Sequence, residues 1–439
     1  KAKIIVGTRS ALFLPFQNLG LLIVDEEHEL SYKQFDPSPR YHARDSAIVL
    51  ARIHKAKVLL GSATPSLESS FNQRSGKYGW VQLQERYGNV ELPEIITIDL
   101  KSAHKKKQMK GGFSKMMIEE MEETLNMDRQ IILFQNQRGY SPIIECLDCG
   151  HMPHCHQCDV TLTYHQYSDQ LKCHYCGYHI PVPQKCHACG MTNLSSKGIG
   201  TQQIQEQVTT LFPEVKVARM DWDTTRGKWA FDKLINSFAK QEVKILVGTQ
   251  MIIKGLDFQN VHLVGVLNAD HLMNFPDFRA HERTYQMLSQ VAGRAGRKVL
   301  RGKVLIQTYQ PHHPIIQNVT NGNYDQMLNQ ELKDRKKYYY PPYIRLIRIV
   351  VNHSDMEILK KASHWIVNVL FQSEYGQILG PVFPPVARIR NRYRMHILVK
   401  ISANNYRDRV KQIIKKTLGH FESIPIFRSC KVNVDVDPY

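Results

Sequence analysis

Short runs of apolar residues, each ending in a polar loop, recur along much of the chain. The first three are "KIIVGTRS", "LGLLIVDEEH" and "AKVLLGSATPS". Strands of a parallel sheet are buried on both faces, so they are apolar throughout and carry functional groups where they end. The pattern therefore predicts strands of a parallel sheet, with the polar loops along one edge.

The same pattern returns later in the chain, in "RQIILFQNQRGY", "VKVARMD", "VKILVGTQM", "VHLVGVLNAD" and "GKVLIQTY". Helical stretches separate these runs, and this alternation is typical of an α/β protein. We predict two α/β domains, at residues 1–127 and 128–310, followed by an α+β domain at 311–439.

Eight of the nine cysteines fall within residues 146–190, as four C-x-x-C pairs. Disulfides, redox dithiols and metal ligands are the possible uses of such pairs. The sequence shows no secretion signal, which favours metal ligands. Two C-x-x-C turns supply the four sulfurs of a tetrahedral zinc site, so four turns predict two zinc ions. We place this module as an insertion in the second domain.

The stretch between the second and third pairs, "DVTLTYHQYSDQLK", alternates like a β-hairpin and would bring those two pairs together. The first and fourth pairs would then close an outer site, although an interleaved arrangement remains the alternative. The predicted ligands are Cys155, Cys158, Cys173 and Cys176 for the inner site, and Cys146, Cys149, Cys186 and Cys189 for the outer site. Four thiolates leave no position open to a substrate, so both zinc ions would be structural.

Basic residues exceed acidic ones by 58 to 40, which gives a formal net charge of +18. Such an excess predicts a polyanionic partner, most commonly nucleic acid. Residues 331–439 hold 20 Lys and Arg against 9 Asp and Glu, an excess of 11. Within them, "ARIRNRYRMHILVK" predicts a strand with one cationic face, or an ordinary solvated one. No apolar run approaches 18 residues, so we expect a cytoplasmic protein with no membrane partner.

Asp25 and Glu26 directly follow the apolar run "LLIV". An Asp at a strand end can hold Mg²⁺, and the next Glu can orient or deprotonate the water that attacks a γ-phosphate. "GSATPS", with Ser62 and Thr64, follows the next run and could link nucleotide state to domain movement. An exposed acidic turn and a plain turn are the structural alternatives.

Two strings of the second domain would suit the same chemistry. In "QVAGRAGR", helical spacing places Gln290, Arg294 and Arg297 on or near one face, where two arginines could stabilise charge on a phosphoryl group. In "GTQMIIKGLDF", Thr249 and Gln250 end a strand before a possible helix whose amides could contact phosphate. A solvated basic helix end and a buried strand-to-helix turn are the alternatives.

These strings, in this order, resemble the motifs of the second helicase superfamily. With four C-x-x-C pairs between the lobes, and with "GTRSALFLPF" and "SYKQFDPSPRYHARD", the whole chain is similar to the PriA family of replication-restart helicases, also called primosomal protein N′. The resemblance implies two RecA-like lobes, the first one partial, and ATP with Mg²⁺ as cofactors.

By this resemblance, Asp25 and Glu26 are the Mg²⁺ and water-activating pair, and Arg294 and Arg297, with Gln290, complete the ATP site. A second set would couple DNA contact to ATP hydrolysis: Tyr32, Phe35, Tyr41 and Arg44 of an aromatic-rich loop, Ser62 and Thr64, and Thr249, Gln250, Gly255 and Asp257. Aromatic faces among basic residues are what base stacking requires. Packing of the loop on its own domain is the alternative.

The resemblance further implies a bacterial, 3′ to 5′ DNA helicase that recognises stalled forks and initiates primosome assembly. Its partners would be single-stranded and forked DNA, primosome proteins, single-stranded-DNA-binding protein and the machinery that loads the replicative helicase. The zinc module would dock primosome proteins or act as a wedge at the duplex junction. A non-catalytic DNA-binding scaffold and an RNA translocase are the rival functions.

The chain also departs from the family pattern. It contains no GxxxxGK[ST] loop to cradle phosphate, and the family's N-terminal DNA-binding domains are missing. We therefore expect a truncated chain that is inactive by itself. Gln137 stands where the family usually has a basic residue, which puts one DNA or nucleotide contact in doubt.

Overall fold

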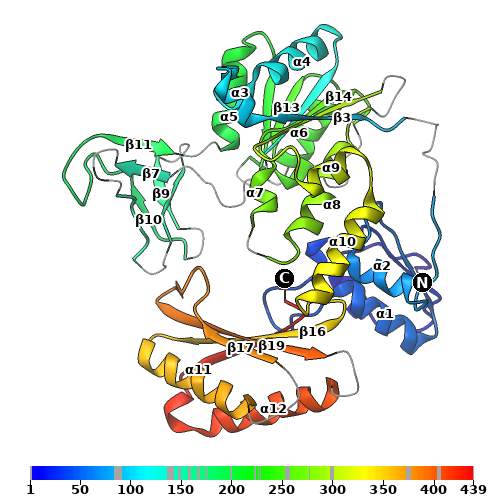
Figure 1. Ribbon diagram of the computed structural model, residues 1–439, viewed down its shortest axis with the longest axis vertical. Coiled ribbons are helices and arrows are strands. Elements are labelled where there is room, and N and C mark those ends of the chain that lie inside the picture. The colour runs from blue at the N-terminus through cyan, green and yellow to red at the C-terminus, as the bar shows by residue number, and fades with distance from the viewer. Residues whose placement is uncertain are drawn as a thin grey trace. The chain divides into compact units, whose positions relative to one another are not determined.

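The computed structural model divides into two compact units, which we describe separately (Figure 1). Unit 1 comprises residues 1–80, 155–160 and 332–439, and unit 2 comprises 81–154 and 161–331. The structure describes all residues except 1, 84–90, 136–142, 147–148, 150, 157–159, 166–168, 174–175, 198–199, 222–223, 226, 228, 253–257, 276, 297–300, 372–376, 403–406 and 439.

The N-terminal part of unit 1 is a small α/β fold. Strand β1 (Leu21–Val24) pairs in parallel with β2 (Lys57–Leu60), and helix α1 (Ala43–His54) connects them. Helix α1 packs on both strands. Its Ala47 and Ala51 are almost fully buried, and such small side chains allow the helix to approach the strands closely. The two strands end side by side, so the loops that follow them leave from one edge.

Three short helices complete this part of unit 1. They are the 3-10 helices η1 (Arg9–Phe13) and η2 (Leu30–Tyr32), and the α-helix α2 (Leu67–Arg74). Helix α2 begins after "GSATPS", where the Ser66 side chain accepts a hydrogen bond from the Ser69 amide. This N-cap fixes the direction in which the chain leaves β2.

The run "KIIVGTRS" is not a strand, contrary to the prediction. Ile4 is 84% exposed and Val6 is 94% exposed, and among the described residues no strand pairs with this segment. A strand needs a neighbour to receive its backbone hydrogen bonds. In the described part of the chain, β1 pairs only with β2, so an apolar run is not sufficient here.

The C-terminal part of unit 1 is the expected α+β domain. Its strands are β16 (Ile344–His353), β17 (Gln377–Val382), β18 (Arg388–Ile389), β19 (Arg392–Ser402) and β20 (Lys431–Val436). They form an antiparallel sheet in the order β17-β19-β16-β20, with β18 on β19. Helices α11 (Met356–Phe371) and α12 (Arg407–Ser423) lie on one face of it (Figure 1).

Strand β19 has an apolar and a basic face. Met395, Ile397, Val399 and Ile401 are buried in the core that the sheet shares with α11 and α12. Successive side chains of a strand alternate between faces. The opposite face of β19 therefore carries Arg392, Arg394, His396, Leu398 and Lys400.

The segment "ARIRNRYRMHILVK" is a hairpin rather than the single strand that we predicted. Ile389 of β18 pairs with Arg392 of β19, and Arg390 and Asn391 form the turn between them. Their φ angles are 51° and 58°, as a two-residue turn of type I′ requires. The pair Arg-Asn is not a usual signal for this turn, because Gly normally follows Asn there.

Unit 2 is built on a six-stranded parallel sheet in the order β12-β13-β6-β14-β15-β3. The strands are β3 (Glu94–Asp99), β6 (Gln130–Phe134), β12 (Val217–Met220), β13 (Ile245–Gly248), β14 (Val261–Val266) and β15 (Lys303–Thr308). Every residue of β6, β13 and β14 is buried. The five strands predicted for the second domain are confirmed. Strand β3 lies upstream of residue 127 but pairs with β15 in this sheet.

Helices follow most strands of this sheet. They are α3 (Leu100–Lys105), α4 (Lys115–Asn126), α5 (Thr201–Leu211), α6 (Ala230–Ala239), α7 (Asp270–Met273), α8 (Ala280–Ala292), α9 (Pro314–Thr320) and α10 (Tyr324–Lys337). Helices α4 and α5 share a buried core with the sheet. A small hairpin of β4 (Met109–Lys110) and β5 (Phe113–Ser114) precedes α4. In the described part of the chain, no helix is long and apolar enough to cross a membrane.

The cysteine-rich segment lies between β6 and α5, as an insertion. Its ends pair with each other, because β7 (Ile143–Cys146) is antiparallel to β11 (Leu194–Lys197). Between them, β8 (Thr163–His165), β9 (Gln170–Lys172) and β10 (His179–Pro181) form a three-stranded sheet. The predicted hairpin between the second and third cysteine pairs is therefore confirmed.

Candidate functional site

The "DEEH" and "GSATPS" loops meet at the edge where β1 and β2 end. Val24 and Leu60 are the last residues of the two strands and lie opposite each other. The Glu27 amide donates to the Gly61 carbonyl at 3.0 Å. Nδ1 of His28 lies 2.7 Å from Oγ of Ser62. The structure thus brings together two strings that the sequence separates by more than thirty residues.

Asp25 and Glu26 are the accessible carboxylates of this edge. Asp25 is exposed, and the Glu26 side chain is 47% exposed. Glu26 has a φ of 47°, in the left-handed region that few non-glycine residues adopt. Its amide donates to the Asp25 carboxylate at 3.0 Å. Carboxylate oxygens open to water suit Mg²⁺, which keeps several water ligands, so the residues fit this ion.

Glu27, the third acidic residue of "DEEH", is only 1% exposed. Its carboxylate accepts hydrogen bonds from the Ser66 amide at 2.6 Å and from the Ser69 hydroxyl at 2.8 Å. It also accepts one from the Arg44 guanidinium at 2.9 Å. These bonds tie β1 to the end of "GSATPS" and to the start of α1, so Glu27 holds the edge in shape.

Arg44 lies inside unit 1, where it is 5% exposed. It was expected in the loop that would sense DNA, but its guanidinium contacts Glu27 and Ser66 instead. The sequence analysis did not identify this role. The burial of Arg44 could have been predicted, because helical spacing puts it on the same face as the buried Ala47 and Ala51.

The aromatic residues of the loop from Tyr32 to Arg44 differ in their surroundings. The Tyr32 hydroxyl donates to the Asp25 backbone carbonyl at 2.6 Å. Burial, together with the carboxylates of Asp25 and Glu29, raises the pKa of Tyr32. Tyr41 packs edge-on against Phe13, with ring centroids 5.0 Å apart. Phe35 is 49% exposed and therefore presents an aromatic surface to solvent.

The residues predicted in the second domain follow β13 and α8. Thr249 comes directly after β13, and Gln250 begins a short 3-10 helix. Gln290 lies near the end of α8. Four further predictions fall outside the described residues: Gln137, Gly255, Asp257 and Arg297.

The helical face predicted for "QVAGRAGR" does not continue to Arg294. Helix α8 ends at Ala292, so Gln290 is helical while Arg294 lies in the following turn. Beyond the helix end, Gly296 has a φ of 65° and packs its backbone against Gly302. A Cβ atom on Gly296 would lie 2.2 Å from the Gly302 nitrogen, so this position requires glycine.

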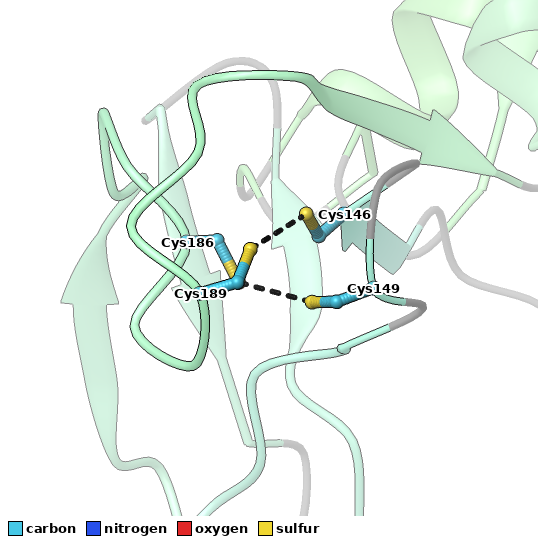
Figure 2. Close-up of side chains that lie close together, drawn as sticks. All are labelled: Cys146, Cys149, Cys186 and Cys189. Carbon is cyan, nitrogen blue, oxygen red and sulfur yellow. Dashed lines mark hydrogen bonds between the residues drawn. The ribbon is translucent and has the colours of Figure 1, made fainter.

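Four cysteine side chains converge from the two ends of the inserted module (Figure 2). They are Cys146, Cys149, Cys186 and Cys189, the residues predicted for the outer site. The sulfurs of Cys146 and Cys189 lie 3.6 Å apart, as do those of Cys149 and Cys186. Zinc–sulfur bonds of about 2.3 Å at tetrahedral angles place sulfurs roughly 3.8 Å apart, so the cluster fits zinc.

A second cluster contains Cys155, Cys173 and Cys176 of the inner site, and the remaining predicted ligand, Cys158, lies outside the described residues. Backbone amides surround the sulfurs of both clusters. The Tyr178 amide donates to the Cys176 sulfur at 3.4 Å. Amide hydrogen bonds, led by that of Cys189, lower the pKa of Cys186 to about 7. In the same cluster, hydrogen bonds among neighbouring thiols raise the pKa of Cys149 and of Cys189, so Cys186 is the thiol that most readily forms the thiolate that metals bind.

Four protein-family models match the chain. They are described as "DEAD/DEAH box helicase" at residues 1–71, "PriA DNA helicase Cys-rich region (CRR) domain" at 155–181, "Helicase conserved C-terminal domain" at 193–299 and "Primosomal protein N C-terminal domain" at 336–439. Their order is that of the fold described above, with the cysteine-rich module before the second helicase domain.

The chain is also similar to curated proteins over its whole length. It is 41% identical to the replication restart protein PriA of Bacillus subtilis, covering 100% of this chain and 54% of that protein. It is 38% identical to the protein of the same name from Haemophilus influenzae, covering 100% of this chain and 59% of the relative. The chain thus spans little more than half the length of these two relatives.

Solved structures give a weaker likeness. Dbp5 of S. cerevisiae, bound to RNA and ADP BeF3, is 15% identical, with a TM-score of 0.39 over 74% of this chain and 63% of that one. Such a score carries no argument, and the identification depends on the relatives and the family models. On that evidence, the chain belongs to the PriA family of replication restart proteins.

Proposed function

We propose that this chain forms part of an ATP-dependent, 3′ to 5′ DNA helicase that recognises branched replication forks and initiates primosome assembly. The observation that carries the proposal is the joining of "DEEH" and "GSATPS" at one strand edge, through His28 and Ser62. The whole-length similarity to PriA relatives supports the same function. An acidic pair alone would not define a motor, but a hydroxyl-rich loop bonded to the two residues that follow the pair, Glu27 and His28, offers a link from nucleotide binding to domain movement.

The three acidic residues of "DEEH" would have different roles in ATP hydrolysis. When bound, Mg²⁺ supplies charge that neutralises the phosphate oxygens. Asp25, exposed at the end of β1, would hold this ion. Glu26 would orient the attacking water and take its proton, and its half-exposed position leaves room for a substrate. Glu27 would keep both neighbours in place through Arg44 and Ser66.

DNA would bind through two surfaces of unit 1. Phe35, exposed in the aromatic loop, offers a face on which a base can stack. The basic face of β19, with Arg392, Arg394 and Lys400, offers charges for phosphates. Thr249, Gln250 and Arg294 of the second helicase domain, together with Gln290, would respond to the nucleotide.

The cysteine module would hold two zinc ions that stabilise its fold. The test is to count zinc by atomic absorption in the purified chain and in single variants. We expect two zinc ions per chain, and one in either Cys149→Ser or Cys173→Ser. A chain with one zinc, or variants that each lose both ions, would contradict two independent sites.

The motor itself is tested by ATP turnover with and without forked DNA. The chain extended upstream to the length of its relatives should hydrolyse ATP, with stimulation by DNA, and Glu26→Gln should abolish turnover. The 439-residue chain alone should show negligible turnover, because it contains no GxxxxGK[ST] loop to bind phosphate.

Two results would overturn this function. A folded, zinc-loaded and ATP-binding extended protein without hydrolysis would favour a non-catalytic DNA-binding scaffold. Equal or stronger stimulation by a forked RNA of matched sequence would favour an RNA translocase. Unwinding of substrates with a single 3′ or 5′ tail would determine the direction separately.

A further inference from the structure

A buried lysine connects the aromatic loop to the C-terminal sheet of unit 1. Lys33 is 1% exposed, and its Nζ atom lies 2.8 Å from Oδ1 of Asp435, which is also 1% exposed. The same ammonium donates hydrogen bonds to the carbonyls of Arg40 at 2.9 Å and Val436 at 2.7 Å. Three oxygens therefore surround a group that has three N–H donors.

On the side of the sheet, Asp435 bridges Lys33 to the basic face. Asp435 lies on β20 opposite Arg348 of β16, and its Oδ2 accepts a hydrogen bond from Arg348 at 3.1 Å. Arg348 in turn lies opposite Leu398 of β19, between His396 and Lys400 on the basic face. The two oxygens of one carboxylate thus contact a buried lysine and an arginine of that face.

On the side of the loop, Lys33 is adjacent to the nucleotide edge. Tyr32 precedes it and donates to the backbone carbonyl of Asp25. The backbone of this segment is fixed from outside as well, since the Arg9 guanidinium donates to the carbonyls of Ser31 and Lys33, both at 3.1 Å. A displacement of Lys33 would therefore move the tyrosine that touches Asp25.

Stability alone does not explain a buried ion pair at this place. Apolar residues of similar volume often stabilise a protein as well as a buried ion pair does, because both charges lose their water. The pair instead fixes the position of the aromatic loop, because the Lys33 ammonium reaches its three oxygen partners in only one placement of that loop. Phosphates that bind Arg348 would compete with Asp435 for its guanidinium, and the freed carboxylate would then interact more strongly with Lys33.

We propose that Lys33 is a positioning residue. Through its contacts with Asp435 and Tyr32, it makes the position of Asp25 depend on whether DNA occupies the basic face of the C-terminal sheet. The inference rests on the proposed function, because it assigns a route for the DNA stimulation of ATP hydrolysis. It predicts that removing the contact between Lys33 and Asp435 lowers the DNA stimulation of ATP hydrolysis without loss of DNA binding.

The test compares two double variants in the extended, ATP-hydrolysing protein. Lys33→Met with Asp435→Leu removes both fully buried charges together, and the two arginines that also contact Asp435, Arg40 and Arg348, remain partly exposed to water. The control is Arg335→Met with Glu68→Leu, which removes an ion pair of 3.5 Å elsewhere in unit 1, between the end of helix α10 and helix α2. ATP turnover is measured without DNA and with forked DNA of mixed sequence, and DNA affinity by fluorescence anisotropy.

We expect the Lys33 and Asp435 variant to bind DNA at least as tightly as the parent, because Arg348 no longer pairs with a carboxylate, and to keep its turnover without DNA. Stimulation by DNA should fall about 2- to 30-fold. The control variant should keep its stimulation. Unchanged stimulation in the first variant would overturn the inference, and so would an equal loss in the control, which would indicate general loosening of unit 1. No stimulation in the parent protein would instead overturn the proposed function, and the inference with it.

A second measurement uses the 439-residue chain and needs no ATP. Forked DNA should change the rate of amide hydrogen exchange in residues 32–44 of the parent chain. The change should disappear in the Lys33→Met, Asp435→Leu variant at saturating DNA. A change that persists in that variant would show that the loop senses DNA by another route and would overturn the proposal.

Discussion

Asp25, Glu26 and Glu27 follow one another in the chain, yet each carboxylate meets a different environment. The first is exposed, the second is about half exposed, and the third is buried against Arg44. The left-handed φ of Glu26 turns the chain between them. Three identical charges in sequence can therefore serve as a ligand, a base and a structural anchor.

Removing the partner of the buried carboxylate should destabilise unit 1 strongly. Arg44→Met leaves the Glu27 charge unpaired in the interior, and we expect a loss of about 3–5 kcal/mol in the free energy of unfolding. The neighbouring exposed change Glu26→Gln should stay within about 0.5 kcal/mol of the parent chain. Urea unfolding followed by circular dichroism compares them. Equal stability of the two variants would contradict the anchoring role of Arg44.

Two partly buried histidines should make unit 1 sensitive to acid. Burial and the neighbouring Arg44 lower the pKa of His42 to about 4. Burial, with Arg348 and Arg394, lowers the pKa of His396 to about 4 as well. Below the ordinary value of 6.5 the unfolded chain binds protons that the folded chain does not, so stability falls as the pH decreases from 6.5 to 4.

The measurement is the urea midpoint at pH 7.5 and at pH 5. His396→Gln removes one of the two contributions, so the drop between these pH values should be smaller in the variant than in the parent chain. An identical drop in both proteins would show that His396 titrates alike in the folded and unfolded states.

Among the elements, the four cysteine turns share one backbone hydrogen bond. In each, the amide of the first cysteine donates to the carbonyl five residues later: Cys146 to His151, Cys155 to Val160, Cys173 to Tyr178 and Cys186 to Met191. Gly177 and Gly190 end two of these turns with φ angles of 80° and 76°. This repeated backbone hydrogen bond positions the cysteine sulfurs, and it depends less on which side chains lie between the cysteines.

A side chain at such a glycine should weaken zinc binding through the backbone alone. A Cβ atom on Gly177 would meet no atom within 4 Å, so Gly177→Ala costs only the left-handed conformation, about 1–2 kcal/mol. We expect weaker zinc retention in competition with a chromophoric chelator. Gly79→Ala, also in open space but without a positive φ, is the control. Equal retention in the two variants would contradict the importance of this turn.

Periodicity predicts the elements of unit 2 better than those of unit 1. Strands β6, β13 and β14 are buried along their full length, and burial on both faces makes a strand readable as an apolar run. "KIIVGTRS" also begins with an apolar run, yet no strand of the described residues pairs with it, and a partner cannot be inferred from a local pattern. The β18–β19 turn was missed because its Arg-Asn pair adopts positive φ angles without glycine.

The residues of the candidate site that lie in short sequence motifs could be predicted. Spacing and the predicted hairpin led to the grouping of cysteines, and strand ends led to Asp25 and Ser62. Lys33 and Asp435 could not be paired from sequence, because about 400 residues separate them. The alternation in "KVNVDV" assigns Asp435 a face of its strand but does not identify its partner. Long-range ion pairs depend on the tertiary fold, which a single sequence does not display.

At the scale of the whole molecule, the net charge of +18 should dominate binding to DNA. Phosphate contacts release counterions, so affinity falls steeply with salt. We expect Arg394→Gln to lower the slope of log affinity against log salt by about 1. Lys360→Gln, on helix α11 and paired with Glu357, should leave the slope unchanged. Anisotropy titrations at several KCl concentrations measure both, and equal slopes would exclude Arg394 from phosphate contact.

Unit 1 is assembled mainly from residues 1–80 and 332–439, and all of unit 2 lies between these two segments in the sequence. During synthesis, β1 and β2 emerge about 250 residues before the segment that completes their unit. At about 5–20 residues per second, they wait roughly 10–50 s on the ribosome. Unit 2 can fold during this interval, whereas Lys33 has no counter-charge until β20 emerges. A chain cut short before β20 would therefore lack the counter-charge of a buried lysine that lies beside β1 and β2.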